Sequence, residues 1–164
     1  MIQTRSPRLG LRRAFTLIEL VAVMVVLAVL AGVAIPKYFD YADRAKTSSV
    51  QGTLGAVRTA LANFYTEAAV AGDAAYPTLA EIRTVGTVMQ EAIPANPYNN
   101  LSTIQRITVL ADAQNRAVSN TTQFGWNYYF DNNANPPVTI FWANSTDQTT
   151  VLNANGQPIR ANRL

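Results

Sequence analysis

A continuous run of apolar residues near the start of the chain is the strongest feature of its hydrophobic pattern. Residues 15–35 read FTLIELVAVMVVLAVLAGVAI and contain one charged side chain, Glu19. A helix of this length, at about 1.5 Å per residue, is about 30 Å long and matches the hydrocarbon core of a bilayer. The run therefore predicts a membrane-spanning helix, and Pro36, which closes it, predicts a kink near its outer end.

Beyond Pro36 the apolar positions recur at spacings of three and four residues. This spacing places them on one face of a helix that continues to about Gly72. The two patterns together predict one helix over residues 15–71, with an apolar first part and an amphipathic second part that lies on a small core. The apolar stripe of the second part consists of Val50, Leu54, Val57, Leu61, Phe64, Tyr65 and Ala68.

A second, shorter helix is predicted after the long one. Residues 78–81, Thr-Leu-Ala-Glu, have the pattern of a capping box, and the helix is expected to run to about Ala92. Pro94 and Pro97 then predict an irregular loop over residues 93–101.

The remainder of the chain is rich in β-branched and aromatic residues and predicts strands. The expected strands cover residues 103–110, 124–130 and 138–143, and the Asn- and Pro-rich connector 131–137 predicts a hairpin between the last two. Residues 151–164 are expected to form an edge hairpin or a loose tail. The whole pattern predicts an α+β fold, in which a long N-terminal helix packs on a small antiparallel sheet of three or four strands.

Aromatic residues are concentrated in the predicted hairpin. Trp126, Tyr128 and Phe130 alternate on one face of a strand, as do Ile140 and Trp142. A sheet face packed against the long helix accounts for them, because buried aromatic side chains dominate small cores. The alternative is a row of rings that stacks on sugars or bases.

The charge distribution separates a basic leader from the rest of the chain. Four of the 13 basic residues, Arg5, Arg8, Arg12 and Arg13, lie in the first 14 positions, where there is no acid. The positive-inside bias places this N-terminus in the cytoplasm and the remainder across the membrane. From Phe15 onward nine basic residues face ten acidic ones, a net charge of −1. This balance lacks the basic surface that binds nucleic acid, so we expect no nucleic-acid partner.

The residue types that catalysis needs are missing. The chain has no histidine and no cysteine, which excludes thiolate and imidazole zinc sites, Ser-His and Cys-His nucleophiles and disulfides. The acidic residues are scattered rather than paired as hydrolytic chemistry requires. We therefore expect that the protein is not an enzyme.

The residues alone leave three interpretations of the apolar run open. It is a signal peptide with a small-residue cleavage site at residues 29–31, a plain membrane anchor, or a segment in which Glu19 has a function. A carboxylate inside an apolar span costs about 2.5–3.5 kcal/mol and therefore indicates a functional site. Glu19 also lies one helical turn from the start of the run, where its side chain can reach the interface without any function.

The start of the apolar run resembles the type IV prepilin family, which includes pilins and type II secretion pseudopilins. The resemblance rests on Arg12-Arg13-Ala14, on the sequence FTLIEL from Phe15, and on the proline 21 positions after Phe15. It implies that a membrane prepilin peptidase cuts between Ala14 and Phe15 and methylates the new α-amine of Phe15. Glycine usually precedes the cut in the family, whereas this chain has Ala14.

The resemblance also implies a role for Glu19 in assembly. Its carboxylate would neutralise the cationic amine of Phe15 in an adjacent subunit, because either charge left alone in an apolar environment is costly. The expected product is a homo-oligomeric filament, either a type IV pilus or a type II secretion pseudopilus. The implied partners are the prepilin peptidase, an inner-membrane platform protein with its ATPase, sibling minor pseudopilins, and membrane lipid before assembly.

The same resemblance divides the chain into three parts. Residues 1–14 are a cleaved leader, residues 15–36 a transmembrane and assembly helix, and residues 37–164 a pilin-like globular domain in the periplasm or in a cell-surface filament. The subunit would cross the bacterial inner membrane once, with its N-terminus in the cytoplasm. The Tyr-Pro-Thr turn at residues 76–78, the loop 94–98 and the absence of cysteine are more similar to a major pseudopilin than to a cysteine-looped pilin.

Two features of the predicted hairpin carry further hypotheses. Asp131, Asn133 and Asn135 have the alternating oxygen spacing of a calcium loop, although a simple turn accounts for them as well. The aromatic residues supply the alternative function, a secreted or membrane-anchored carbohydrate-binding module whose first helix serves only for export.

Overall fold

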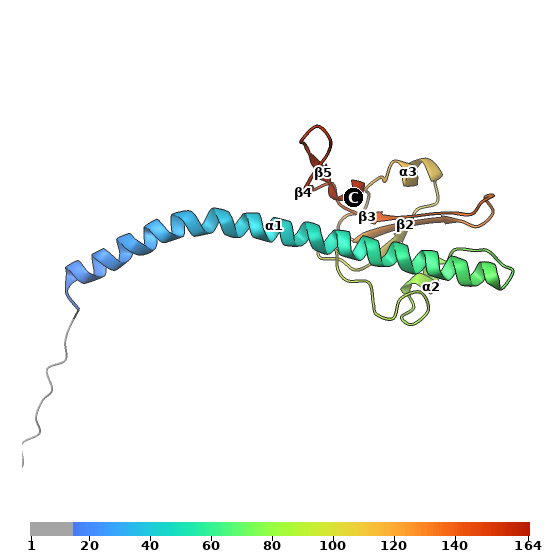
Figure 1. Cartoon of the computed structure of the whole chain (residues 1–164), viewed down its shortest axis with the longest axis horizontal. Coiled ribbons are helices and arrows are strands. Elements are labelled where there is room, and N and C mark those ends of the chain that lie inside the picture. The colour runs from blue at the N-terminus through green and yellow to red at the C-terminus, as the bar shows by residue number, and fades with distance from the viewer. Residues whose placement is uncertain (1–14) are drawn as a thin grey trace, which may run out of the picture. The chain divides into compact units, whose positions relative to one another are not determined.

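The structure, a computed structural model, describes residues 15–164 and has the expected α+β fold (Figure 1). It consists of two units, one ending at Asp40 and the other comprising Tyr41–Leu164. The basic leader, including the Ala14 side of the expected cleavage site, lies outside the described residues. The expected boundary between residues 36 and 37 stays a prediction.

Helix α1 comprises Leu17–Val70 and confirms the predicted long helix. Within the second unit it buries Val50, Leu54, Val57 and Leu61, which are the first four positions of the predicted apolar stripe. After Val70 the chain turns at Gly72, whose φ of +92° is a conformation that glycine adopts without strain. There the N–H of Asp73 donates to the carbonyl of Ala68 at 3.0 Å.

Helix α2 is shorter than predicted. It comprises Leu79–Arg83 and begins with the expected capping box, in which Thr78 and Glu81 bond each other's backbone. The prediction that it reaches Ala92 is wrong, because Thr84 already has an extended backbone with ψ of 114°. Thr84, Val85 and Gly86 all have low helix propensity, so nothing local extends the helix past its fifth residue.

The main sheet has three strands in the order β1-β2-β3: Ile104–Arg106, Trp126–Asp131 and Val138–Ala143. Strands β2 and β3 form the predicted antiparallel hairpin, with Tyr128 opposite Phe141.

The pairing of β1 corrects the antiparallel sheet expected from the sequence. Strand β1 runs parallel to β2, with Ile104 beside Trp126. Parallel neighbours need a crossover of about a dozen residues or more, and residues 107–125, which include helix α3 (Leu110–Gln114), supply it. Helix α3 occupies the end of the strand that the sequence predicted over residues 103–110.

The C-terminal residues form a separate small sheet. Strand β4, Gln148–Leu152, pairs antiparallel with β5, Pro158–Arg160, and a short 3₁₀ helix follows over Ala161–Arg163. The expected edge hairpin is therefore present, but its strands pair with each other and not with the main sheet. It contacts α1 where the N–H of Thr150 donates to Thr47 Oγ1 at 3.1 Å.

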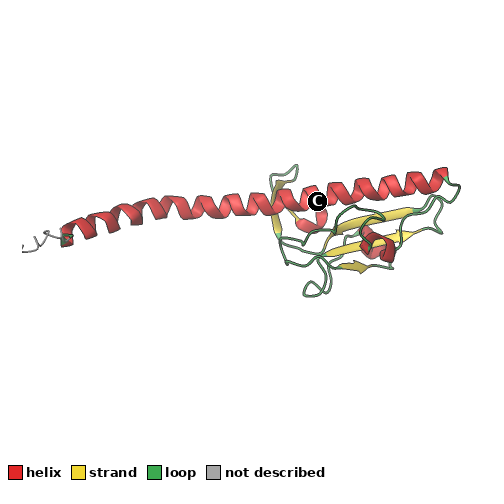
Figure 2. Cartoon of the chain, turned by 90° about the horizontal axis from the view of Figure 1, so that it is seen from below, coloured by secondary structure: helices red, strands yellow, loops and turns green. Residues whose placement is uncertain are grey.

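Both faces of the main sheet are covered. On one face Trp126, Tyr128 and Phe141 pack against the buried stripe of α1 (Figure 2). On the other face Tyr129 and Trp142 pack against Ala113 of α3, which lies on the opposite side of the strands from α1 (Figure 1). This arrangement corrects the expectation that a single face against the long helix accounts for all the aromatic residues.

Candidate functional site

The candidate site is the first turn of α1, where Thr16 and Glu19 bond each other. Glu19 Oε2 accepts hydrogen bonds from the backbone N–H and the hydroxyl of Thr16, each at 2.9 Å. In return the N–H of Glu19 donates to Thr16 Oγ1 at 3.2 Å. This is a second capping box, which pairs two backbone donors that a helix start would otherwise leave without partners.

Thr16 is a residue of the site that the sequence reasoning missed. The signal was available, because a threonine followed three residues later by a glutamate is the capping-box pattern. The same pattern was recognised at Thr78 and Glu81. The box also fixes the hydrogen bonding of the Glu19 carboxylate. Its Oε2 atom accepts both hydrogen bonds from Thr16 and so caps the first turn of its own helix.

The surface that follows this first turn is apolar all round. Every residue from Phe15 to Tyr41 is exposed, including Leu17, Met24 and Leu30 at 60% or more. Within the described residues α1 is the one helix long and apolar enough to cross a membrane by length and composition. An exposed apolar surface of this size marks a site of membrane or protein contact.

Pro36 lies inside α1, with helical residues on both sides. A proline inside a helix removes one backbone hydrogen bond and bends most helices. The kink at Pro36 stays a prediction. Immediately after it, the rings of Tyr38 and Phe39 are exposed and meet edge to face, with centroids 5.9 Å apart.

The residues of the expected calcium loop lie at the tip of the β2–β3 hairpin. Asp131 Oδ1 accepts a hydrogen bond from the N–H of Asn133 at 2.9 Å, which is the bond of an Asx turn. Asn133 and Asn135 are exposed. Among residues 15–164 no group of three or more acidic side chains is arranged to hold a metal ion. Calcium binding at Asp131, Asn133 and Asn135 stays a prediction.

The residue between the expected ligands has a clear structural role. The side-chain amide of Asn132 accepts from the N–H of Tyr76 at 2.8 Å and donates to the Tyr76 carbonyl at 2.9 Å. This pair of bonds ties the hairpin tip to the turn that follows α1.

Most hairpin aromatics are core residues, and Phe130, which is half-buried, lies under the guanidinium of Arg106. Trp126, Tyr128 and Trp142 have no exposed surface. Their polar atoms bond loop carbonyls: Trp126 Nε1 donates to Pro94, Trp142 Nε1 to Ala117, and the Tyr128 hydroxyl to Pro77. Their ring faces are therefore closed to a sugar.

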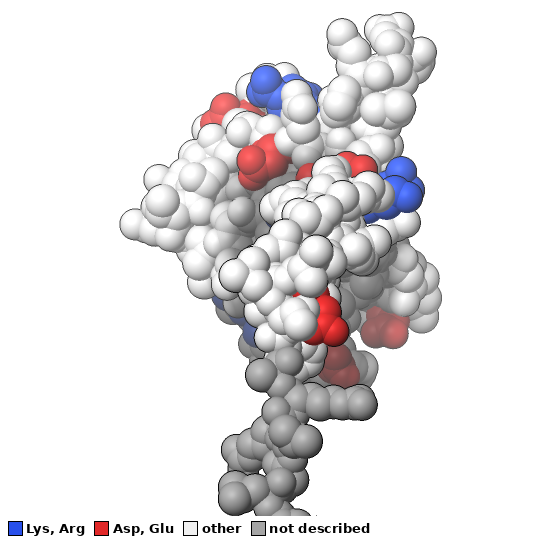
Figure 3. All heavy atoms as spheres, turned by 90° about the vertical axis from the view of Figure 1, so that its left-hand side faces the viewer, with Lys and Arg blue, Asp and Glu red and all other residues white. Residues whose placement is uncertain are grey.

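The charges of the described residues are mixed in sign. On the face drawn in Figure 3, acidic and basic side chains are interspersed across the surface. The ion pair between Lys46 and Asp43, at 3.7 Å, lies near the start of the second unit.

Comparisons with known proteins concern the N-terminal part of the chain. Residues 10–35 match the family described as the prokaryotic N-terminal methylation motif. A type IV major fimbrial protein of Dichelobacter nodosus is 38% identical over 64 residues, which are 39% of this chain and 41% of that protein. A type IV major alpha-pilin of Moraxella bovis is 42% identical over 50 residues, 30% of this chain and 31% of that protein.

A third relative is a type IV narrow pilus major component of Thermus thermophilus, 42% identical over 50 residues, which are 30% of this chain and 43% of that protein. The matches thus span less than half the length of these relatives. No solved structure is significantly similar to the chain.

Proposed function

By its N-terminal segment the chain belongs to the type IV prepilin family, and from this premise we propose that it is a structural subunit of a filament. One observation carries the proposal. The methylation motif leads into a helix whose apolar residues are exposed on every side and whose first turn holds a carboxylate. When copies of such a helix pack side by side, each helix covers the exposed apolar side chains of its neighbours.

The proposed first step is hydrolysis of the peptide bond between Ala14 and Phe15 by a prepilin peptidase, followed by methylation of the new amine of Phe15. Two observations support this position. Phe15 and Thr16 precede the first helical residue, Leu17, and Phe15 is 87% exposed. The bond to be cut therefore borders a segment outside the regular helix, where backbone can enter a peptidase.

The proposed second step pairs Glu19 of one subunit with the amine of Phe15 in the next. An ionised carboxylate can accept hydrogen bonds at both oxygens. Thr16 bonds only Oε2 within the described residues, so Oε1 remains for a neighbour's amine. The capping box holds this carboxylate in one position, and a fixed acceptor gives the pairing a defined register.

At a finer level we propose that the filament is a type IV pilus or a type II secretion pseudopilus. The Tyr-Pro-Thr turn at residues 76–78 and the lack of cysteine support the pseudopilus, whereas the relatives that share the N-terminal segment are type IV pilus proteins. The proposal includes an inner-membrane location with a cytoplasmic N-terminus and a periplasmic globular domain. It also includes the platform protein, its ATPase and sibling minor pseudopilins as partners. The alternative of a carbohydrate-binding module gains no support from the aromatic hairpin, because its large rings are buried.

The experiment is expression in a bacterium that has a prepilin peptidase, with mass spectrometry of the mature chain and purification of filaments. We expect a mature N-terminus at a methylated Phe15. We expect Glu19→Ala to be inserted and cut but to yield no filament. Glu67→Ala, which removes an exposed carboxylate near the far end of the same helix, is the matched control and should assemble. A mature N-terminus at Gly32, or normal filaments from Glu19→Ala, would contradict the proposal.

A further inference from the structure

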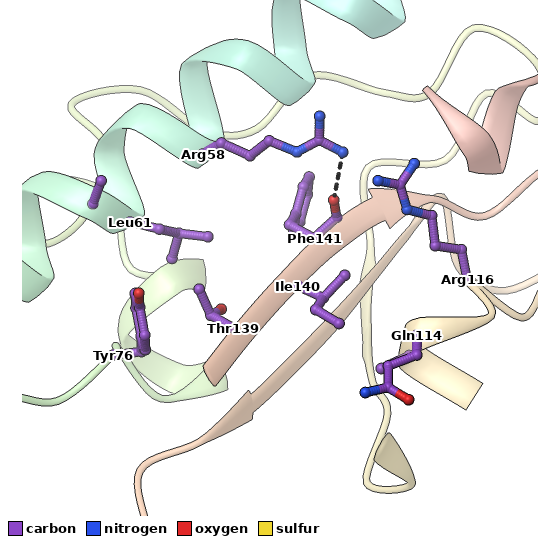
Figure 4. A pocket seen from close by; sticks show the side chains of 10 residues that line it. Arg58, Leu61, Tyr76, Gln114, Arg116, Thr139, Ile140 and Phe141 are labelled. Carbon is purple, nitrogen blue, oxygen red and sulfur yellow. Dashed lines mark hydrogen bonds between the residues drawn. The ribbon is translucent and has the colours of Figure 1, made fainter. Parts of the chain in front are cut away.

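A cleft in the second unit lies away from the N-terminal site and has no role in the proposed assembly. It lies beside α1 and β3 and next to α3 (Figure 4), and its volume is about 550 Å³. Pockets that take small molecules have volumes of about 300–1,000 Å³. Its lining includes Arg58, Leu61, Ala62, Arg116, Ile140 and Phe141.

Two arginine head groups converge in this cleft. Arg58 Nη2 donates to the carbonyl of Phe141 at 3.2 Å and to the backbone oxygen of Leu164 at 3.0 Å. Arg116 Nη1 donates to the same oxygen of Leu164 at 2.6 Å. Figure 4 shows the two guanidinium groups facing each other beside the end of β3. Each guanidinium has five N–H donors, so most donors of both groups remain for a ligand.

Within the described residues, no acidic side chain balances the positive charge of this pair. Among residues 15–164 neither guanidinium has a carboxylate side chain within 4.0 Å. Burial, and then the positive charge of Arg116, lowers the pKa of Arg58. Burial, and then the charge of Arg163, lowers the pKa of Arg116. Two guanidinium groups share one backbone oxygen, and the charge of Arg163 acts on Arg116 as well, so the cluster is cationic whether that oxygen belongs to a carbonyl or to a carboxylate.

The rest of the lining is apolar or weakly polar. Ala62 is exposed and Tyr76 and Ile140 are half-buried, so these three side chains offer apolar surface to a ligand. Leu61 and Phe141, by contrast, are almost fully buried. Figure 4 shows Leu61 and Tyr76 at the end of the cleft away from Arg116. The cleft therefore combines a cationic end, suited to a carboxylate or phosphate, with an apolar wall.

We propose that this cleft binds a small organic anion, with its carboxylate or phosphate at Arg58 and Arg116 and an apolar or aromatic body against Ala62, Tyr76 and Ile140. A lone acidic side chain from a neighbouring copy fits the observations less well. It would reach the arginines but would leave the apolar wall and most of the volume empty.

The test measures binding of defined probes to the full chain in zwitterionic detergent micelles, by isothermal titration calorimetry against blank micelles. Benzoate and phenyl phosphate are the amphipathic anions, acetate and inorganic phosphate lack the apolar body, and benzamide lacks the charge. We expect saturable binding of benzoate or phenyl phosphate, at least fivefold tighter than acetate or phosphate, and no saturation with benzamide. The tighter of the two aromatic anions identifies the head group. Equal binding of benzamide and benzoate would overturn the proposal.

Two pairs of variants locate the site. Arg116→Gln should weaken benzoate at least tenfold, whereas Arg160→Gln, the same charge change at an exposed residue outside the cleft, should not.

Arg116 also bonds the backbone oxygen of Leu164, so its substitution can disturb the fold. The second pair of variants therefore leaves both arginines in place. Ala62→Glu brings a carboxylate to the exposed helix wall of the cleft and should weaken benzoate at least tenfold, and Ala62→Gln, of similar size, should weaken it less than threefold. Unchanged benzoate binding to Ala62→Glu would overturn the proposal. A second result would also overturn the proposal: the parent chain binds none of the probes, and Arg116→Gln loses filament assembly. That result would assign the arginines to a contact between subunits.

Discussion

At the scale of single residues, this protein uses the polar atoms of buried aromatic side chains to hold its loops. The Tyr128 hydroxyl donates to the carbonyl of Pro77 at 2.7 Å, and Trp126 Nε1 donates to the carbonyl of Pro94 at 2.9 Å. Each ring thus fills the core with its apolar body and satisfies a loop carbonyl with its polar end. The side chains that the sequence suggested for ligand stacking instead connect the sheet to the loops.

The Tyr128 hydroxyl predicts a dependence of stability on pH. Burial raises the pKa of Tyr128 well above its usual value, so the folded chain binds this proton more tightly than the unfolded chain. The stability that it contributes is complete below about pH 10 and is lost as the pH rises further. We expect Tyr128→Phe to lose about 1–3 kcal/mol near neutral pH, because the Pro77 carbonyl loses its donor. The difference in stability between Tyr128→Phe and the parent chain should decrease as the pH rises above about 10.

The measurement is the Tm of the two chains from about pH 8 to about pH 11, across the ordinary tyrosine pKa. Tyr41→Phe makes the same change at a ring that is 66% exposed and serves as the control. A Tyr128→Phe deficit that is constant over this range would show that the hydroxyl titrates normally.

At the scale of elements, the close approach of two backbones sets the start of β2. The N–H of Gly125 donates to Thr103 at 2.9 Å, and its carbonyl accepts from the N–H of Asn144 and the side chain of Asn96, each at 2.9 Å. A Cβ at Gly125 would overlap the carbonyl group of Leu101. Only glycine allows the loop before β1 to pass this close to β2.

We therefore expect Gly125→Ala to be destabilised by about 1–3 kcal/mol or more, since the clash is with backbone and cannot be relieved by a rotamer change. Gly55→Ala is the matched control. Gly55 is exposed within α1, and no atom of the described residues lies within 4 Å of an added Cβ. This second change should stabilise the helix by about 0.5–1 kcal/mol. Urea unfolding of both variants measures the difference, and equal midpoints would contradict this account of the β2 start.

At the scale of the whole molecule, the two units differ in the exposure of their apolar side chains. Residues 15–40 expose them, whereas the second unit buries Val50, Leu54 and the rings of Trp126, Tyr128 and Trp142 in a core. Helix α1 contributes residues to both units, so one secondary-structure element has an exposed apolar surface in its first part and packs into a protein core in its second part.

This division predicts that a charge is costly in the first unit and tolerated on the surface of the second. Leu27→Arg puts a cation at the middle of the apolar run, where insertion costs about 2.5–3.5 kcal/mol. We expect most of this variant to leave the membrane fraction after an alkaline carbonate wash. Leu152→Arg makes the same change at a side chain that is 57% exposed in β4, and it should stay in the membrane like the parent chain. Equal retention of both variants would argue against a spanning helix.

Local pattern was sufficient for α1, for the start of α2 and for the hairpin. The apolar run, the stripe from Val50 to Leu61 and the capping box at Thr78 depend on neighbours three or four positions apart, and all three are present in the structure. The motif from Phe15 to Leu20 likewise lies within one short segment, so the similarity to the N-terminal methylation motif depends on no tertiary contact.

Tertiary structure decided what depends on contacts between distant residues. The parallel direction of β1 and the second core cluster around Trp142 follow from how the crossover through α3 returns to the sheet. Arg58 and Arg116 are separated along the chain, and no short-range pattern brings them to one cleft. Side-chain periodicity is a local property, whereas the partner and direction of a strand are set by the packing of the whole unit.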